Sequence, residues 1–166
     1  AQKIESIWDI TDSKEIESKD ISFYKEVPKH SVFFNLDIQQ LKNRLTNVPK
    51  RGFVNSNQGV IINFPDVKGN VESYLVQEAS VMEPELQNEF PEIRSYIGRN
   101  ANNPSSVIRF SLSPQKGFSG MILSGGKTVF IDPYTVDLNK YIVFTNTLED
   151  NPREPFNCET EFATSE

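Results

Sequence analysis

The sequence contains little of the chemistry on which most enzymes depend. It has one histidine, His30, and one cysteine, Cys158. A lone cysteine excludes an internal disulfide. The chain also lacks an H-E-x-x-H helix, a Cys-x-x-Cys pair, a phosphate-binding P-loop and the glycine pattern of dinucleotide-binding folds. No catalytic site can therefore be assembled from sequence motifs.

Positive charge and long apolar runs are also scarce. The 17 Lys and Arg residues are outnumbered by 23 Asp and Glu residues, which gives a formal net charge of −6. Because no basic cluster stands out, nucleic acid is a disfavoured partner. No apolar run approaches the roughly 20 residues of a membrane-spanning helix, so we expect no membrane partner. A length of 166 residues fits a single domain.

The chain starts Ala1-Gln2, without an initiator methionine. Such a start is typical of what remains after a signal peptide is removed. We therefore expect a secreted, extracellular protein.

Two helices are expected. Ile38, Leu41 and Leu45 recur at helical spacing, and Asn35 or Asp37 can cap the first turn, which predicts the main helix over about 37–47. A short helix is predicted over about 84–90, because proline favours the first turn of a helix and Pro91 stops it. Leu86 and Phe90 would form its apolar face.

Short β-prone runs separated by turn residues make up most of the remainder. They are expected at 30–36, 60–64, 71–81, 107–112, 118–123, 128–131 and 141–144. This order predicts an antiparallel meander, and with the main helix an α+β domain over 1–148. Residues 1–28 are expected as an extended N-terminal arm, and packing as a terminal strand on the sheet is favoured over a role in partner binding.

Several residues can be considered for chemistry and have simpler interpretations. His30 lacks a recognisable nucleophile, so an enzyme built on it and a carboxylate is the least favoured hypothesis. Gly125-Gly126 lies between two β runs and predicts a hairpin turn, not a phosphate site. The carboxylate pairs are typical of a solvated helix face; they are Glu83/Glu85 and Glu89/Glu92.

The tail over 149–166 differs from the rest of the chain. It is acidic and has few bulky apolar groups, so we expect an extended strap. A thiolate is a strong zinc ligand and can fill the open coordination position of a three-ligand catalytic zinc. Cys158 would then inhibit a zinc enzyme by displacing the water that the metal activates. The alternatives are an unpaired surface thiol or a disulfide with another segment.

A series of segments in fixed order resembles the N-terminal region of secreted bacterial reprolysin-like (adamalysin-type) metalloproteases of the metzincin group. These segments are FNLD at 34–37, VIINFP at 60–65, VQEASVMEPEL at 76–86, FPEIRSYIG at 90–98, VIRFS at 107–111, MILSGG at 121–126 and FIDPY at 130–134.

The resemblance implies a propeptide that assists folding of the protease domain and keeps it latent. The chain itself would be no enzyme and have no cofactor of its own, and its partner would be the cognate zinc metalloprotease catalytic domain. The expected inhibitory strap contains Arg153, Phe156, Asn157, Cys158 and Glu159. Metzincin cysteine switches usually place glycine after the cysteine and often arginine before it, and this chain has neither. The alternative is a stand-alone secreted binding or adhesion module that uses loop 99–104.

Overall fold

The computed structural model describes residues 7–21, 27–28, 30–50, 58–79, 84–89 and 93–145. Nine strands form one antiparallel sheet in the order β1-β2-β9-β8-β7-β6-β5-β4-β3. Their bounds are β1 Trp8–Thr11, β2 Val32–Leu36, β3 Val60–Pro65, β4 Val71–Glu78, β5 Arg94–Asn100, β6 Val107–Ser113, β7 Gly117–Ser124, β8 Lys127–Pro133 and β9 Lys140–Thr145.

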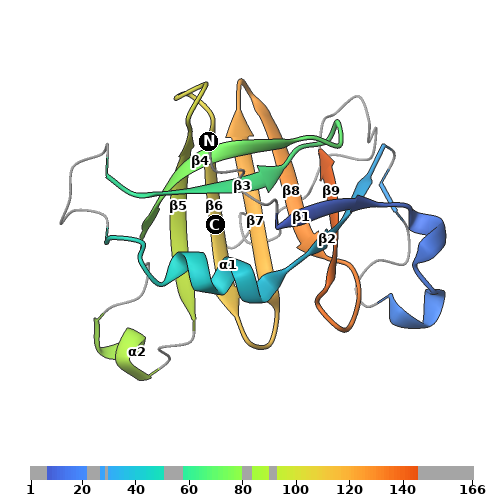
Figure 1. The fold of residues 1–166 in the computed structure, drawn as a ribbon, viewed down its shortest axis with the longest axis horizontal. Helices are drawn as coiled ribbons and strands as arrows, with labels where there is room; N and C mark the ends of the chain where they lie inside the picture. The colour runs from blue at the N-terminus through green and yellow to red at the C-terminus, as the bar shows by residue number, and fades with distance from the viewer. Residues whose placement is uncertain are drawn as a thin grey trace, which may run out of the picture.

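The α+β class predicted from the sequence is wrong. Strands make up 52% of the structure and helices 15%, and the sheet curls into a half-barrel. The two α-helices, α1 (Ile38–Leu45) and α2 (Pro84–Glu89), are too short to form a layer of their own. The fold is therefore mostly β (Figure 1).

The curl brings the two edge strands of the sheet together. β1 and β3 lie at opposite ends of the strand order, yet the indole Nε1 of Trp8 donates a hydrogen bond to the Asn63 carbonyl at 2.8 Å. Figure 1 shows β3 in front of β6 and β7, and β1 farther along in front of β8 and β9. Within the described residues, the Trp8 side chain thus joins these two edges, by its hydrogen bond to Asn63 and its ring contact with Phe64, without a strand ladder between β1 and β3.

Helix α1 begins where the sequence predicted. The Asp37 carboxylate accepts a hydrogen bond from the Gln40 backbone N–H at 3.2 Å, which satisfies a donor in the first turn. Leu41 and Leu45 are buried in the same core as the inner face of the sheet. α1 therefore covers the lower part of the concave side that β1 and β3 leave open (Figure 1).

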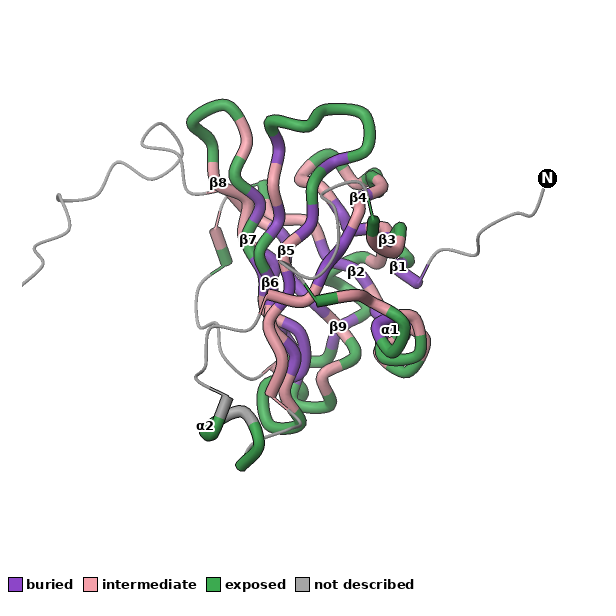
Figure 2. Tube along the Cα trace, turned by 90° about the vertical axis from the view of Figure 1, so that its left-hand side faces the viewer, coloured by how far each residue is buried: buried purple, intermediate pink, exposed green. Residues whose placement is uncertain are grey.

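Aromatic side chains fill the space inside the curl. The Trp8 ring makes edge contacts with Phe34, Phe118 and Tyr141, whose centroids lie 5.4–6.4 Å away. The buried Tyr141 hydroxyl accepts a hydrogen bond from the Phe118 N–H at 3.0 Å. Figure 2 shows that burial is concentrated between the strands and α1, whereas α2 and the loop tips are exposed.

The N-terminal segment is more ordered than an extended arm over 1–28 suggests. Within the described residues 7–21, β1 pairs with β2, and two short 3-10 helices follow at Ser13–Glu15 and Ser18–Asp20. Ile16 packs on the outer face of the sheet against Phe33 and Ile142. The favoured expectation of a terminal strand on the sheet is confirmed for Trp8–Thr11.

The short helix α2 lies in the connection between the neighbouring strands β4 and β5. Of its expected apolar face, Leu86 is 45% exposed. Phe90 lies outside the described residues, as does the whole predicted strap over 149–166.

Candidate functional site

Two surfaces of the half-barrel have the character of binding sites. One is an apolar patch on the convex side, and the other is a cavity on the concave side beneath α1.

The convex patch follows from the strand register. Ile97 on β5, Arg109 on β6, Met121 on β7 and Phe130 on β8 are successive cross-strand partners, so their side chains form one row. A second row next to it contains Arg99, Val107 and Leu123. We call these seven residues the convex patch. Directly opposed side chains lie about 5 Å apart, so the rows are continuous.

The patch is apolar and open to solvent. Met121 and Leu123 are 39% and 42% exposed, and their neighbours Ile97, Val107 and Phe130 are half-buried. Arg99 and Arg109 are exposed, and neither has an ion-pair partner within the part of the chain that the structure describes. An exposed apolar patch with free cations is typical of a protein-binding surface.

The same convex side is covered at its other end. There the N-terminal segment places Ile16 over Phe33, Tyr134 and Ile142. Phe144 packs against this cluster and stacks on Phe130 of the patch, with ring centroids 5.4 Å apart. One apolar surface therefore runs across the sheet, and the described part of the N-terminal segment covers its β2–β9 end.

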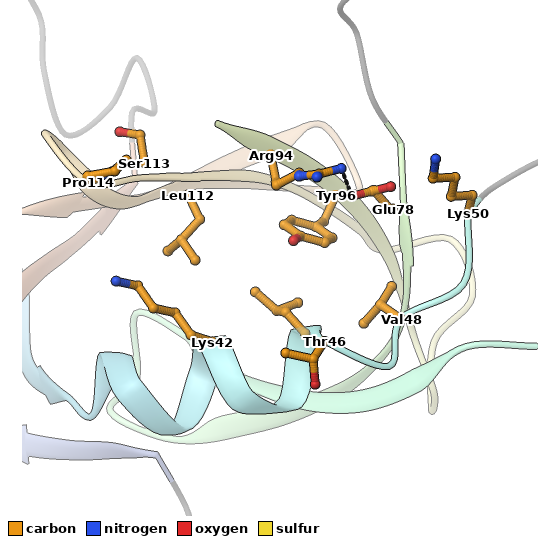
Figure 3. Close-up of a pocket in the computed structure, with 11 residues that line it drawn as sticks. Lys42, Thr46, Val48, Lys50, Glu78, Arg94, Tyr96, Leu112, Ser113 and Pro114 are labelled. Atoms are coloured by element: carbon orange, nitrogen blue, oxygen red, sulfur yellow. Dashed lines mark hydrogen bonds and ion pairs between the residues drawn. The ribbon is translucent and has the colours of Figure 1, made fainter. Parts of the chain in front are cut away.

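The α1 cavity lies between the C-terminal half of α1 and three strand ends, namely the C-terminal end of β4, the N-terminal end of β5 and the C-terminal end of β6 (Figure 3). Its volume is about 620 Å³. It is lined by Lys42, Leu45, Thr46, Val48, Lys50, Glu78, Arg94, Tyr96, Leu112, Ser113 and Pro114.

The wall of the α1 cavity contains a built ion pair. The Arg94 guanidinium lies 3.1 Å from the Glu78 carboxylate, whose side chain is only 11% exposed. The pKa of the neighbouring Tyr96 is raised to about 12, mainly by burial and also by the Glu78 carboxylate, whereas Arg94 acts to lower it. The phenol is therefore protonated and available as a hydrogen-bond donor at neutral pH.

His30, Glu85 and Glu89 lie apart from both surfaces. His30 is exposed in the turn before β2, with a positive φ of 62°, and the Ser31 hydroxyl beside it donates to the Pro28 carbonyl. Glu85 and Glu89 are exposed on α2, and Glu83 and Glu92 lie outside the described residues. In the described ranges, no group of three or more His, Cys, Asp or Glu residues has the arrangement of a metal site.

Gly125 and Gly126 form the β7–β8 hairpin turn with positive φ angles of 56° and 81°, so the predicted turn is confirmed. Arg153, Phe156, Asn157, Cys158 and Glu159 lie outside the described residues. No helix in the described part of the chain is long and apolar enough to cross a membrane.

Loop 99–104, the proposed contact of a binding module, is organised internally. The Asn100 side chain is buried, and its Oδ1 accepts hydrogen bonds from the N–H groups of Asn102 and Asn103 at 2.8 and 3.0 Å. Its Nδ2 donates to the Glu72 carboxylate at 2.6 Å. Asn100 therefore acts as the scaffold of the turn.

Comparison with protein-family models, with curated proteins and with solved structures finds no match for this chain. The function is therefore argued from the two surfaces and from the segments singled out in the sequence.

Both surfaces were missed from the sequence. One signal was present for the convex patch, because residues 121–123 and 129–131 are apolar without alternation, which indicates a strand with apolar groups on both faces. No pattern in the sequence predicts the α1 cavity, because its lining residues come from α1, the segment after α1 and three strands, which are far apart along the chain.

Proposed function

We propose that this chain is the propeptide of a secreted zinc metalloprotease, which it inhibits and helps to fold. The observation that carries the proposal is the position of the segments with metalloprotease-propeptide resemblance. FPEIRSYIG, VIRFS, MILSGG and FIDPY fall on the neighbouring strands β5, β6, β7 and β8. Each contributes one residue of the first row of the convex patch: Ile97, Arg109, Met121 and Phe130.

The chemistry of the patch supports a protein partner. A folded domain gains nothing in stability from exposed Met121 and Leu123 side chains, and a partner that covers them removes apolar surface from water. Arg99 and Arg109 would pair with carboxylates of the partner, which favours the correct orientation on docking. In the proposed zymogen this partner is the zinc-containing catalytic domain.

The test is inhibition of the catalytic domain, encoded with an H-E-x-x-H-x-x-G-x-x-H helix downstream of Glu166 in the same reading frame. The chain added in trans is expected to inhibit hydrolysis of a peptide substrate. Met121→Glu should weaken inhibition at least about tenfold, as expected for a residue central to an interface. Val136→Glu is the matched control, because Val136 is 65% exposed and lies outside the patch.

A stop codon after Glu166, or a catalytic domain that the chain does not inhibit, would overturn the proposal. Equal inhibition by the Met121→Glu and wild-type chains would retain the propeptide and remove the convex patch as its docking face.

The contribution of Cys158 is tested separately. We propose that its thiolate ligates the catalytic zinc, so Cys158→Ser should give a zymogen with measurable activity before cleavage. Alkylation of the thiol in the wild-type chain should have the same effect. A fully latent Cys158→Ser zymogen would instead show that the strap blocks the cleft sterically.

A further inference from the structure

We propose that the α1 cavity is a binding site for a small amphipathic anion, with a carboxylate or comparable acidic head and an apolar tail. The proposal does not depend on the propeptide function, because it rests on a different surface of the molecule.

The apolar part of the cavity suits a hydrocarbon tail. Leu45 of α1 and Leu112 of β6 are buried and line the cavity. Val48 and the Tyr96 ring complete this apolar region, and Figure 3 shows Leu112 and Val48 on opposite sides of it. A volume of about 620 Å³ lies within the range of small-molecule sites, about 300–1,000 Å³. A tail placed there would leave water for an apolar environment that is already formed.

The charged part of the cavity suits an anionic head. The lining contains three cations, Lys42, Lys50 and Arg94, and one carboxylate, Glu78. Glu78 is paired with Arg94, which leaves the two lysines as the excess charge. Neither lysine has an ion-pair partner in the described residues, and Figure 3 shows them on opposite sides of Leu112, Tyr96 and Val48.

This local charge is opposite in sign to that of the whole chain. A protein of net charge −6 repels anions at long range. An anion therefore binds in the cavity only if the local positive charge and the apolar contacts together outweigh this repulsion, which favours an anion with an apolar tail. A cationic amphiphile would meet Lys42 and Lys50. A neutral one would leave the lysines without a role.

Fixed groups in the wall would orient the head. The Arg94–Glu78 ion pair holds the guanidinium at the edge of the apolar region. The Tyr96 hydroxyl lies beside it and stays protonated at neutral pH. A head placed between Lys42 and Arg94 can accept charge-assisted hydrogen bonds, which are about twice as strong as neutral ones.

The experiment is calorimetric titration of the full chain with octanoate, with octan-1-ol as the neutral probe of the same length. Octanoate is expected to bind at one site and octan-1-ol at least about tenfold more weakly. The double variant Lys42→Glu/Lys50→Glu should weaken octanoate binding at least about tenfold. Lys14→Glu/Lys68→Glu makes the same change in net charge at exposed lysines outside the cavity and should leave binding within about twofold.

Amide NMR shifts locate the bound probe, and those at Leu45, Tyr96 and Leu112 should be the largest. Thr46→Trp, which fills the cavity from an exposed position on its rim, should abolish the shifts. Three outcomes would overturn the proposal: no binding at millimolar octanoate, an equal effect of the two double variants, or shifts confined to the convex patch. The proposal would also be overturned if the chain bound an acidic peptide that contains phenylalanine but did not bind octanoate, because the cavity would then take a peptide and not a small amphipathic anion. None of these outcomes bears on protease inhibition.

Discussion

The Trp8 indole and the Asn63 carbonyl join the two edge strands of the sheet at 2.8 Å, across a sequence separation of 55 residues. Trp8 is also the centre of the aromatic core, in contact with Phe34, Phe118 and Tyr141. One side chain therefore both closes the curl and fills it.

Trp8→Phe should lower the free energy of unfolding by about 1–3 kcal/mol, because it removes the hydrogen bond to Asn63 and leaves a smaller ring in the core. The free energy of unfolding is measured by urea unfolding followed by far-UV circular dichroism. Tryptophan fluorescence cannot be used, because Trp8 is the only tryptophan and the variant lacks it. Ile10→Ala on the same strand is the control. Ile10 is 61% exposed, so a change within about 0.5 kcal/mol is expected. A Trp8→Phe protein as stable as the wild type would refute the closing role.

Stability should fall at alkaline pH. Burial raises the pKa of both Tyr96 and Tyr141 to about 12, above the value near 10 of an exposed phenol. The folded state therefore favours the protonated form. This contribution is complete below pH 10 and is lost as the pH rises from about 10 through 12, by about 2 kcal/mol for each phenol.

Tyr141→Phe isolates this effect. It should flatten the pH dependence of the free energy of unfolding between about pH 10 and 12 relative to the wild type. At neutral pH it should cost about 1–3 kcal/mol, because the buried Phe118 N–H loses its acceptor. An unchanged pH profile would contradict the assignment to Tyr141.

Gly120 should not tolerate a side chain. A Cβ at this position would lie 2.9 Å from the Phe110 Cβ and 3.1 Å from the Phe118 ring, both in the core. Gly120→Ala is therefore expected to reduce stability by about 1–3 kcal/mol through overpacking, measured as the shift in urea midpoint. Ser111→Ala, on the outer face of β6, should shift the midpoint by much less. Equal shifts would show that the core relaxes around the methyl group.

Asp37 is the N-cap of α1, the helix whose C-terminal half lines the α1 cavity. Asp37→Ala should cost about 1 kcal/mol, because the Gln40 N–H loses its side-chain acceptor. Asp37→Asn should restore most of this, since asparagine caps equally well. Thermal unfolding of the wild type and the two variants measures these differences. If the asparagine variant were as unstable as the alanine variant, the stabilisation by Asp37 would come from its charge and not from the capping hydrogen bond.

The features that could be predicted from the sequence are those set by neighbouring residues. Asp37 lies directly before the helix that it caps, and Gly125-Gly126 separates two strands that pair across it. The fold class was not predictable in this way. Trp8–Thr11 is a strand because it pairs with β2, and β2 in turn lies between β1 and β9, at the far end of the chain.

The candidate sites depend on the same long-range register. Arg109 and Met121 become neighbours only once β6 and β7 pair, and Lys42 reaches the cavity only when α1 docks on the sheet. Neither of these two contacts can be predicted from the spacing of the residues along the sequence. The predicted strap and Cys158 lie outside the described residues and stay predictions.

The position of β2 in the sheet has a consequence for the order of folding. Val32 pairs with Val143, so β2 has no partner on that side until almost all of the described chain has been synthesised. The hairpins from β3 to β8 connect strands that are neighbours along the chain and can assemble first. Closure of the sheet by β1, β2 and β9 is then the late step, and on the ribosome a nascent chain that ends before residue 140 would expose the aromatic core.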